Sequence, residues 1–366
     1  MKIAFDIRNL NEKKFSGVNN YIYNTATSLM KIDKENEYFF YNNKKKYLNK
    51  KIIKLHNIKY IPNYPRPIWT NILLPIKLQR DKIDVLFTGK METPIFFNNT
   101  FKSICTIFDC GIDKYPKTGK LIDYYYGRIT KKISHKIADA IISISKNTAK
   151  DYIDIYQADP KKIYPIYLGV NNDIKKTFDI NKFLKLKSKY QINKDYFLFV
   201  GNIHPRKNIL NMIDAFDNIK NNNLQIIIVG KKAWKYEKII TKINEHKNVR
   251  YIGYISDEEL STLYSFAYAF IFPSINEGFG LPVLEAMKCG CPVICSNNSS
   301  MLEIVGGAAL MFDPFCVKDI KAKINLIIQN EKIRKELVYR GYRRYKNFSW
   351  DKTAKNILKI INDIKH

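Results

Sequence analysis

Short apolar segments alternate along the chain with longer segments in which apolar residues recur every three or four positions. In the first half, runs rich in Ile, Val, Phe and Tyr predict strands at 2–7, 37–41, 83–87, 102–107, 140–144 and 163–167. Several of these runs are apolar throughout, which is typical of a parallel sheet covered on both faces. The periodic segments between them predict helices at 18–31, 118–137 and 145–156.

A second series of the same kind follows. Strands are predicted at 196–200, 224–229, 249–252, 268–272 and 292–295. Helices are predicted at 207–220, 235–246, 256–265 and 281–289. The tail from residue 316 has a helical period, and Trp350 begins a last amphipathic helix that reaches Ile364. Two successive β/α series predict an α/β protein with two doubly wound sheets.

The break between the two series is marked by a change in composition. The sequence Gly-Val-Asn-Asn at 169–172 is followed by a polar stretch at 173–194, which predicts an interdomain linker. A chain of 366 residues has room for two domains, each with its own core.

The net charge of +28, from 62 basic and 34 acidic residues, adds a question about partners. Such a field favours nucleic acid, anionic lipid headgroups or phosphorylated substrates. The alternative is a general bias towards Lys at the surface, because Lys is spread along the whole chain.

The longest apolar run, Phe266–Phe272, is too short for a membrane helix. Asp6 and Arg8 interrupt any secretory signal, so we expect a cytoplasmic protein.

Metal chemistry is not indicated by the sequence. The six Cys residues form no C-x-x-C pair and the five His residues are widely separated, which argues against a zinc site. No D-x-D triplet occurs either. We therefore expect no bound metal and no cofactor.

The most informative stretch runs from Asn276 to Met287. Glu277 precedes a Gly-Phe-Gly turn after an apolar strand, Pro282 occupies a first-turn position of a helix, and Glu285 lies one turn inside that helix. Backbone N–H groups and the positive end of the helix suit a diphosphate or sugar hydroxyls, and the two carboxylates are good acceptors for hydroxyls. The alternative interpretation is an ordinary helix cap with an exposed Glu.

Two cations follow the strand at 196–200. Arg206 and Lys207 precede a predicted helix, next to Gly201 at the carboxyl end of the strand, where open α/β sheets bind ligands. Cations at the positive end of a helix are unfavourable unless an anion accompanies them, and a diphosphate would be such an anion. Gly17, before the first helix, is a weaker anion-loop signal that lacks the spacing of a dinucleotide fingerprint.

Together these strings resemble glycosyltransferase family 4. The similar stretches are FVGNIHPRKN, LQIIIVG, VRYIGYISDEEL, ADAIISISKNTAKDY, SGVNNYIYN, TIFDCGIDKYP and the long run from PSINEGFG to MFDP. The resemblance covers nearly the whole chain and is most specific at residues 196–313. It implies a retaining enzyme of GT-B fold, with two facing Rossmann-like domains and a cleft between them. Bacterial mannosyltransferases that build surface polysaccharides look most similar.

The resemblance also implies domain limits and a division of labour. We expect an acceptor-side domain at 1–172, a linker at 173–194, a nucleotide-sugar domain at 195–348, and a C-terminal helix at 349–366 that packs back towards the first domain. The donor would be a nucleoside diphosphate sugar, GDP-mannose or a UDP-sugar, and the acceptor a glycan or lipid-linked glycan.

The family's site residues map onto this sequence one by one. Glu277 matches the first Glu of the E-x7-E motif, which binds the donor sugar, and Glu285 matches the second, which binds the ribose. Arg206 and Lys207 match the basic pair on the diphosphate. The remaining matches are donor-loop residues, the N-domain loop glycine and the Asp of a His-Asp pair: Gly278, Phe279, Gly280, Leu281, Gly17 and Asp109.

One position departs from the family pattern. Phe108 stands where the family has a His before Asp109, a His that lines the catalytic crevice. The change leaves three alternatives open: altered acceptor choice, reduced activity, or a sugar-nucleotide binder without catalysis. A nucleotide-sugar epimerase of the same fold is argued against by the E-x7-E string, and a nucleic-acid-binding protein by the absence of a recognisable binding motif.

A basic stretch from Lys117 to Lys136 contains Tyr124, Tyr125 and Tyr126. Basic helices with interfacial aromatics bind anionic membrane surfaces. The enzyme would then be peripheral at the cytoplasmic face of a membrane. The alternative is an ordinary surface helix with its Tyr side chains packed inward.

Overall fold

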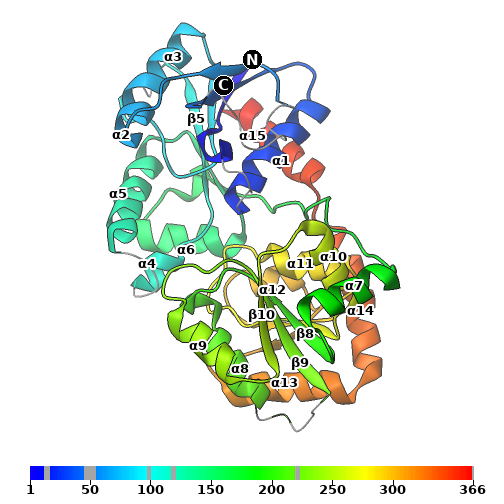
Figure 1. Ribbon diagram of the computed structural model, residues 1–366. Helices are drawn as coiled ribbons and strands as arrows, with labels where there is room; N and C mark the ends of the chain where they lie inside the picture. Colours follow the sequence, from blue (N-terminus) through cyan, green and yellow to red (C-terminus); the bar gives the residue numbers. More distant parts are fainter. Residues whose placement is uncertain are drawn as a thin grey trace. The chain divides into compact units, whose positions relative to one another are not determined.

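The computed structural model describes residues 1–11, 17–44, 55–96, 100–116, 121–217, 219 and 223–364. The chain divides into two compact units. The first comprises Met1–Lys114, Leu121–Gly169 and Ser349–His366, and the second Tyr115–Lys120 and Val170–Phe348 (Figure 1).

The first unit contains a parallel seven-stranded sheet in the order β3-β2-β1-β4-β5-β6-β7. Its strands are β1 (Lys2–Asp6), β2 (Glu37–Asn42), β3 (Ile58–Tyr60), β4 (Val85–Thr88), β5 (Lys102–Ile107), β6 (Ala140–Ser143) and β7 (Ile163–Pro165). Strands β4 and β6 are buried at every position, as expected from their apolar sequences. The direction of strand addition reverses between β1 and β4, so the carboxyl ends of these two strands form a topological switch point.

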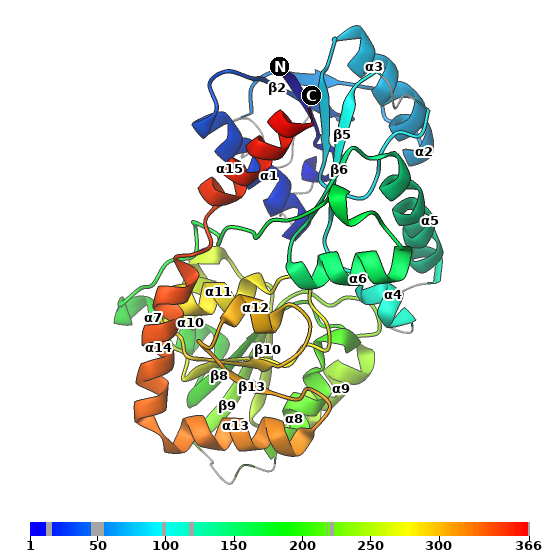
Figure 2. The same ribbon diagram turned by 180° about the vertical axis from the view of Figure 1, so that it is seen from behind.

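Helices cover both faces of this sheet. They are α1 (Gly17–Ile32), α2 (Arg66–Ile68), α3 (Leu74–Arg80), α4 (Gly111–Lys114), α5 (Leu121–Ile137), α6 (Lys146–Tyr156) and α15 (Trp350–Asp363), with 3-10 turns η1 (Arg8–Asn11) and η5 (Pro160–Lys162). A π-helical turn, η3 (Trp69–Leu73), joins α2 to α3. Helices α1 and α15 lie side by side on one side of β5, and helices α2, α3 and α5 lie on its other side (Figures 1 and 2).

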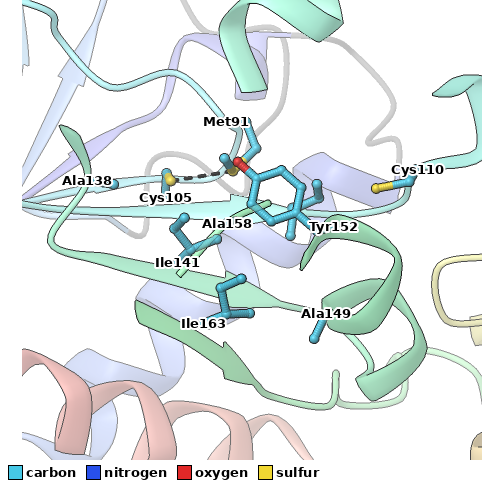
Figure 3. Packing of buried hydrophobic residues seen from close by; sticks show 10 residues of the cluster. Met91, Cys105, Cys110, Ala138, Ile141, Ala149, Tyr152, Ala158 and Ile163 are labelled. Atoms are coloured by element: carbon cyan, nitrogen blue, oxygen red, sulfur yellow. Dashed lines mark hydrogen bonds between the residues drawn. The ribbon is translucent and has the colours of Figure 1, made fainter. Parts of the chain in front are cut away.

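One core cluster of the first unit fills the space between the sheet and α6. Cys105, Ile141 and Ile163 come from three neighbouring strands and pack around Tyr152 of α6 (Figure 3). The hydroxyl of this buried Tyr donates to the backbone oxygen of Lys131 at 2.8 Å, so burying the ring leaves its polar group satisfied.

The second unit contains a parallel six-stranded sheet in the order β10-β9-β8-β11-β12-β13. Its strands are β8 (Asp195–Val200), β9 (Leu224–Val229), β10 (Val249–Gly253), β11 (Ala269–Phe272), β12 (Val293–Ser296) and β13 (Leu310–Phe312). Its helices are α7 (Ile180–Tyr190), α8 (Ile209–Asp217), α9 (Glu237–Glu245), α10 (Asp257–Phe266), α11 (Leu281–Lys288), α12 (Met301–Val305), α13 (Val317–Gln329) and α14 (Glu331–Tyr345), with a 3-10 turn η6 (Pro205–Lys207). Strand addition reverses between β8 and β11.

Several elements differ from the sequence prediction. Residues 173–194, predicted to be a linker, include α7 and belong to the second unit, where Phe183 stacks on Phe266 of α10 with ring centroids 4.3 Å apart. Helix α8 begins at Ile209 rather than 207, because Pro205–Lys207 form a 3-10 turn and Asn208 adopts a left-handed conformation (φ 56°). Residues 118–120 of the predicted helix 118–137, and residues 218 and 220 of the predicted helix 207–220, lie outside the described residues.

Candidate functional site

Two loops meet at the switch point of the second unit. One follows β8 and contains Gly201 to Asn208; the other follows β11 and leads to α11. The backbone N–H of Ile275 donates to the oxygen of Arg206 at 2.9 Å, which ties the two loops together. The carboxyl ends of β8 and β11 therefore carry the residues that the sequence singled out, at the place where open α/β sheets bind ligands.

Arg206, Lys207 and Glu277 form one charged cluster. The Nζ of Lys207 lies 2.5 Å from Oε1 of Glu277, and the two side chains are only 14% and 12% exposed. Arg206 donates through Nη1 to the backbone oxygen of Asn276 at 2.8 Å. Burial raises the pKa of the Glu277 carboxyl, but Lys207 and Arg206 outweigh it and hold that pKa below its ordinary value. Glu277 is consequently a carboxylate acceptor for hydroxyl groups at neutral pH.

A third loop, residues 298–300 after β12, holds the backbone around Glu277. The backbone N–H of Glu277 donates to Oγ of Ser299 at 3.0 Å, and Oγ of Ser300 donates to the oxygens of Glu277 and Phe279 at 2.9 and 3.2 Å. Asn298 donates through Nδ2 to the oxygen of Ile275 at 2.5 Å. The sequence analysis gave these three residues no role. The sequence feature that could have identified them is the polar run directly after β12, because β12 lies next to β11 and its carboxyl end is at the same edge of the sheet.

The Gly-Phe-Gly turn ends at the start of α11. Gly280 is the N-cap of this helix with φ 97°, a left-handed conformation that other residues adopt at a cost. Pro282 lies in the first turn, where its missing N–H removes no helical hydrogen bond. The turn therefore presents a helix N-terminus, with its partial positive charge, beside Glu277.

Glu285 projects from the next turn of α11 in a different environment. The hydroxyl of Tyr264 donates to its Oε2 at 3.4 Å. Burial and the nearby charge of Asp257 raise the pKa of Glu285 to about 7. The two Glu residues of the motif thus have opposite pKa shifts.

Gly201 lies close to a second glycine that the sequence analysis did not single out. A Cβ atom on Gly230, which has φ 149°, would lie 1.9 Å from the backbone oxygen of Gly201. The loops after β8 and β9 can approach this closely only with glycine at position 230. The sequence feature that could have identified Gly230 is its position directly after the apolar strand 224–229.

The other two predicted residues belong to the first unit. Gly17 is the first residue of α1 and is exposed. Asp109 follows β5 and accepts a hydrogen bond from the backbone N–H of Gly111 at 2.9 Å, at the start of α4. Phe108 packs edge-on against Tyr21 of α1, with ring centroids 5.3 Å apart. An aromatic contact thus occupies the position of the family's His.

Within the described residues, no group of three or more His, Cys, Asp and Glu side chains is arranged to hold a metal ion. In the same part of the chain, every helix is too short or too polar to span a bilayer.

Comparison with known proteins agrees with this architecture. Residues 15–174 match the family described as Glycosyltransferase Family 4, and residues 182–344 match Glycosyl transferases group 1. O-antigen chain mannosyltransferase B of Escherichia coli is 32% identical over 281 residues, covering 74% of this chain and 72% of the relative. The serotype-specific mannosyltransferase WbdA of Escherichia coli is 27% identical, covering 70% of this chain but only 33% of the relative.

Solved structures agree on the fold. The crystal structure of Anabaena HepE in complex with UDP-glucose has a TM-score of 0.78 and 16% sequence identity, and it covers 99% of this chain and 100% of HepE. The two parallel sheets, each with a switch point in its strand order, have the GT-B glycosyltransferase fold. The chain belongs to glycosyltransferase family 4, within the group that includes bacterial O-antigen mannosyltransferases.

Proposed function

We propose that the enzyme transfers a hexose, with mannose favoured, from a nucleoside diphosphate sugar to a glycan or lipid-linked glycan with retention of configuration. The observation that carries the proposal is the largely buried cluster of Lys207, Arg206 and Glu277 next to the N-terminus of α11. Mannose is supported by the relatives named as mannosyltransferases, and a nucleotide-sugar donor by the UDP-glucose complex of HepE.

Each group has a part in the proposed reaction. Glu277 accepts hydrogen bonds from donor-sugar hydroxyls, and Glu285 accepts them from the ribose. Arg206, Lys207 and the N-terminus of α11 stabilise the negative charge that grows on the leaving diphosphate. No metal is required in this scheme, because protein cations and a helix dipole supply the positive charge.

We propose no covalent nucleophile among the described residues. The family resemblance implies a front-face displacement, in which the departing phosphate helps to deprotonate the acceptor hydroxyl. Gly17 and Asp109 of the first unit would contribute near the phosphates and the sugar.

The test is release of nucleoside diphosphate from a panel that includes GDP-mannose, UDP-glucose and UDP-galactose, with a glycan acceptor present. Release from one donor, abolished in Glu277→Gln, is expected. Binding without turnover for every donor would favour the non-catalytic alternative that Phe108 leaves open.

A further inference from the structure

A hollow of about 510 Å³ lies on the second unit, and none of its lining residues has a part in the proposed function. It forms where α14 passes the turn that ends α12 (Figure 2). The turn contributes residues 306–308, and α14 contributes Tyr339 and three Arg side chains. The volume falls within the range of about 300–1,000 Å³ that small-molecule sites occupy.

The three Arg side chains, Arg340, Arg343 and Arg344, form an Arg cluster that stands out against the composition of the chain. Only ten of the 62 basic residues are Arg, and three of these ten fall within positions 340–344. A general bias towards Lys therefore does not explain the cluster. Arg differs from Lys in its planar fork of N–H groups, which binds two oxygens of a phosphate at once. The residue type, as well as the charge, favours a phosphate ligand.

Arg344 is held in place at the C-terminus of α12. It donates through Nε to the backbone oxygen of Ile304 at 2.8 Å and through Nη2 to the backbone oxygen of Glu303. A Cβ atom on Gly306, which has φ 51°, would lie 2.9 Å from Cζ of Arg344, so glycine lets the guanidinium lie this close to the turn. Nη1 has no acceptor among the described residues. A ligand in the hollow would therefore meet a guanidinium that is already ordered, which lowers the entropy cost of binding.

The other two cations of the cluster are weakly neutralised. Arg340 lies 2.5 Å from Oε1 of Glu336, but the two side chains are 54% and 51% exposed, and such surface pairs contribute little. Arg343 donates to the hydroxyl of Tyr339 at 3.4 Å and pairs with no carboxylate in the described part of the chain. An anion in the hollow would offset the mutual repulsion of these cations.

The rest of the lining suits a hydroxylated ligand rather than a hydrocarbon. Ala308 is the one aliphatic side chain that lines the hollow. Tyr339 is 62% exposed and offers both an apolar ring face and a polar hydroxyl, a combination that suits a sugar ring. Asn347, just after α14, adds an amide that can donate to hydroxyl groups and accept from them.

We propose that this hollow binds the phosphomonoester of a small sugar, with the phosphate on the Arg cluster and the sugar against Tyr339 and Asn347. The site is separate from the donor site. The loop 298–300, which holds Glu277, lies at the N-terminus of α12, and the hollow lies at its C-terminus. The inference therefore does not depend on the proposed function.

The test is titration calorimetry of the full-length protein with mannose 6-phosphate, and with mannose and inorganic phosphate as the two halves of this probe. Mannose 6-phosphate should bind at least tenfold more tightly than either half, because the sugar and the phosphate contact different parts of the lining. The donor site also attracts phosphate, so the titration is repeated in Arg206→Ala, where the affinity should be unchanged.

Matched variants locate the binding. Arg340→Gln/Arg343→Gln changes two exposed side chains and should weaken binding of mannose 6-phosphate by tenfold or more. Lys332→Gln/Lys335→Gln makes the same change of charge at two exposed positions in the first half of the same helix and should leave the affinity unchanged. Arg343→Lys keeps the charge without the fork and should lose part of the affinity. Tyr339→Ala should weaken mannose 6-phosphate but not inorganic phosphate.

Four outcomes would overturn the inference. Equal losses in the Arg pair and the Lys pair would mean that net charge attracts the ligand. Equal affinity for mannose 6-phosphate and inorganic phosphate would indicate an adventitious ion only. Affinity lost in Arg206→Ala and kept in the Arg pair would assign the ligand to the donor site. Binding of anionic vesicles or nucleic acid without mannose 6-phosphate would assign the Arg cluster to a polyanion. Nucleoside diphosphate binding, measured in the same samples, reports separately on the proposed function, because no donor residue lines the hollow.

Discussion

Glu285 should link donor binding to proton release. Its pKa of about 7 in the free protein leaves it about half protonated at neutral pH. Ribose hydroxyls that donate to the carboxylate favour its charged form and lower that pKa. Affinity for the nucleoside diphosphate should therefore rise from pH 6 to pH 8, with protons released on binding. Calorimetry in two buffers of different ionisation enthalpy measures both quantities.

The control for this prediction is Glu285→Gln, which keeps the shape and cannot titrate. Its affinity should be weaker, by roughly the 1.5–3 kcal/mol of a charge-assisted hydrogen bond, and should lack the pH dependence attributed to Glu285. An unchanged pH profile in this variant would assign the proton to another group. Unchanged affinity would remove Glu285 from the site.

Lys207 should matter to both turnover and stability. Lys207→Met removes a charge from the leaving diphosphate and leaves the mostly buried Glu277 carboxylate without its cation. Breaking such a pair costs about 3–5 kcal/mol when the partner stays charged. The double variant Lys207→Met/Glu277→Gln should regain stability in urea unfolding while remaining inactive. A double variant as unstable as the single one would show that the pair contributes little.

Arg206→Ala should reduce turnover while the fold remains, because its guanidinium donates to a backbone oxygen of the neighbouring loop and acts on charge that grows in the transition state. Wild-type activity should survive chelation by EDTA, because protein groups supply the positive charge. Strict dependence on a divalent ion would contradict this account of the leaving group.

At the scale of elements, the loop 298–300 should set donor affinity through Glu277. Ser300 is buried, and Ser300→Ala leaves the oxygens of Glu277 and Phe279 without its hydroxyl. Each lost hydrogen bond costs about 1 kcal/mol, so the KM for the donor should rise several-fold. Ser296→Ala is the control, because that buried hydroxyl has no hydrogen-bond partner among the described residues and its removal should change little. If Ser300→Ala and Ser296→Ala changed the KM for the donor equally, the loop 298–300 would not set donor affinity.

Elements with strong apolar patterns were predictable from the sequence, and short or interrupted ones were not. Fully buried strands such as 224–229 were predicted at their observed positions. Strands β3 and β13 have three residues each, too few to show a period. The helical segment 66–80 was missed because Pro75 interrupts its pattern, and the same Pro produces the π-turn. Helix α7 was missed because it buries little more than Leu186.

For the candidate site, sequence motifs identified the groups that would touch the donor and missed the groups that support them. Arg206, Lys207 and Glu277 were recognised from their resemblance to a family, and the structure pairs Lys207 with Glu277 and bonds Arg206 to the backbone of the residue before Glu277. Ser299 and Ser300 support Glu277 through hydrogen bonds between their hydroxyl groups and its backbone. The bonded residues are more than 20 positions apart, so they leave no local pattern in the sequence. The pKa difference between Glu277 and Glu285 depends on neighbours in space, so spacing along the chain could not predict it.

At the scale of the whole molecule, the charge of +28 predicts reversible binding to anionic vesicles at low salt. Each Lys or Arg near such a surface contributes about 1 kcal/mol within a Debye length of about 10 Å at 0.1 M salt. The structure sharpens the choice of residues on α5, because Lys131 is paired with Asp113 while Lys132 and Lys136 are exposed. Lys132→Glu/Lys136→Glu should reduce co-sedimentation with anionic vesicles, and rising salt should do the same.

The matched control is Lys355→Glu/Lys359→Glu on α15, which makes the same change of net charge at two exposed positions of a helix. Equal loss of binding in both pairs would mean that total charge, rather than α5, attracts the vesicle. Absence of sedimentation in the wild type at low salt would indicate that the charge is a general surface bias.

The last helix also has a consequence for the order in which the protein is made. Helix α15 buries Trp350, Ala354 and Ile357 in the first unit, and Thr353 donates to the oxygen of Tyr167 at 2.7 Å. A ribosome therefore finishes the second unit before it delivers the helix that completes the first. At about 5–20 residues per second, the nascent chain waits on the order of ten seconds or longer with the apolar face of α1 uncovered. The half of the enzyme synthesised first is therefore the half that finishes folding last.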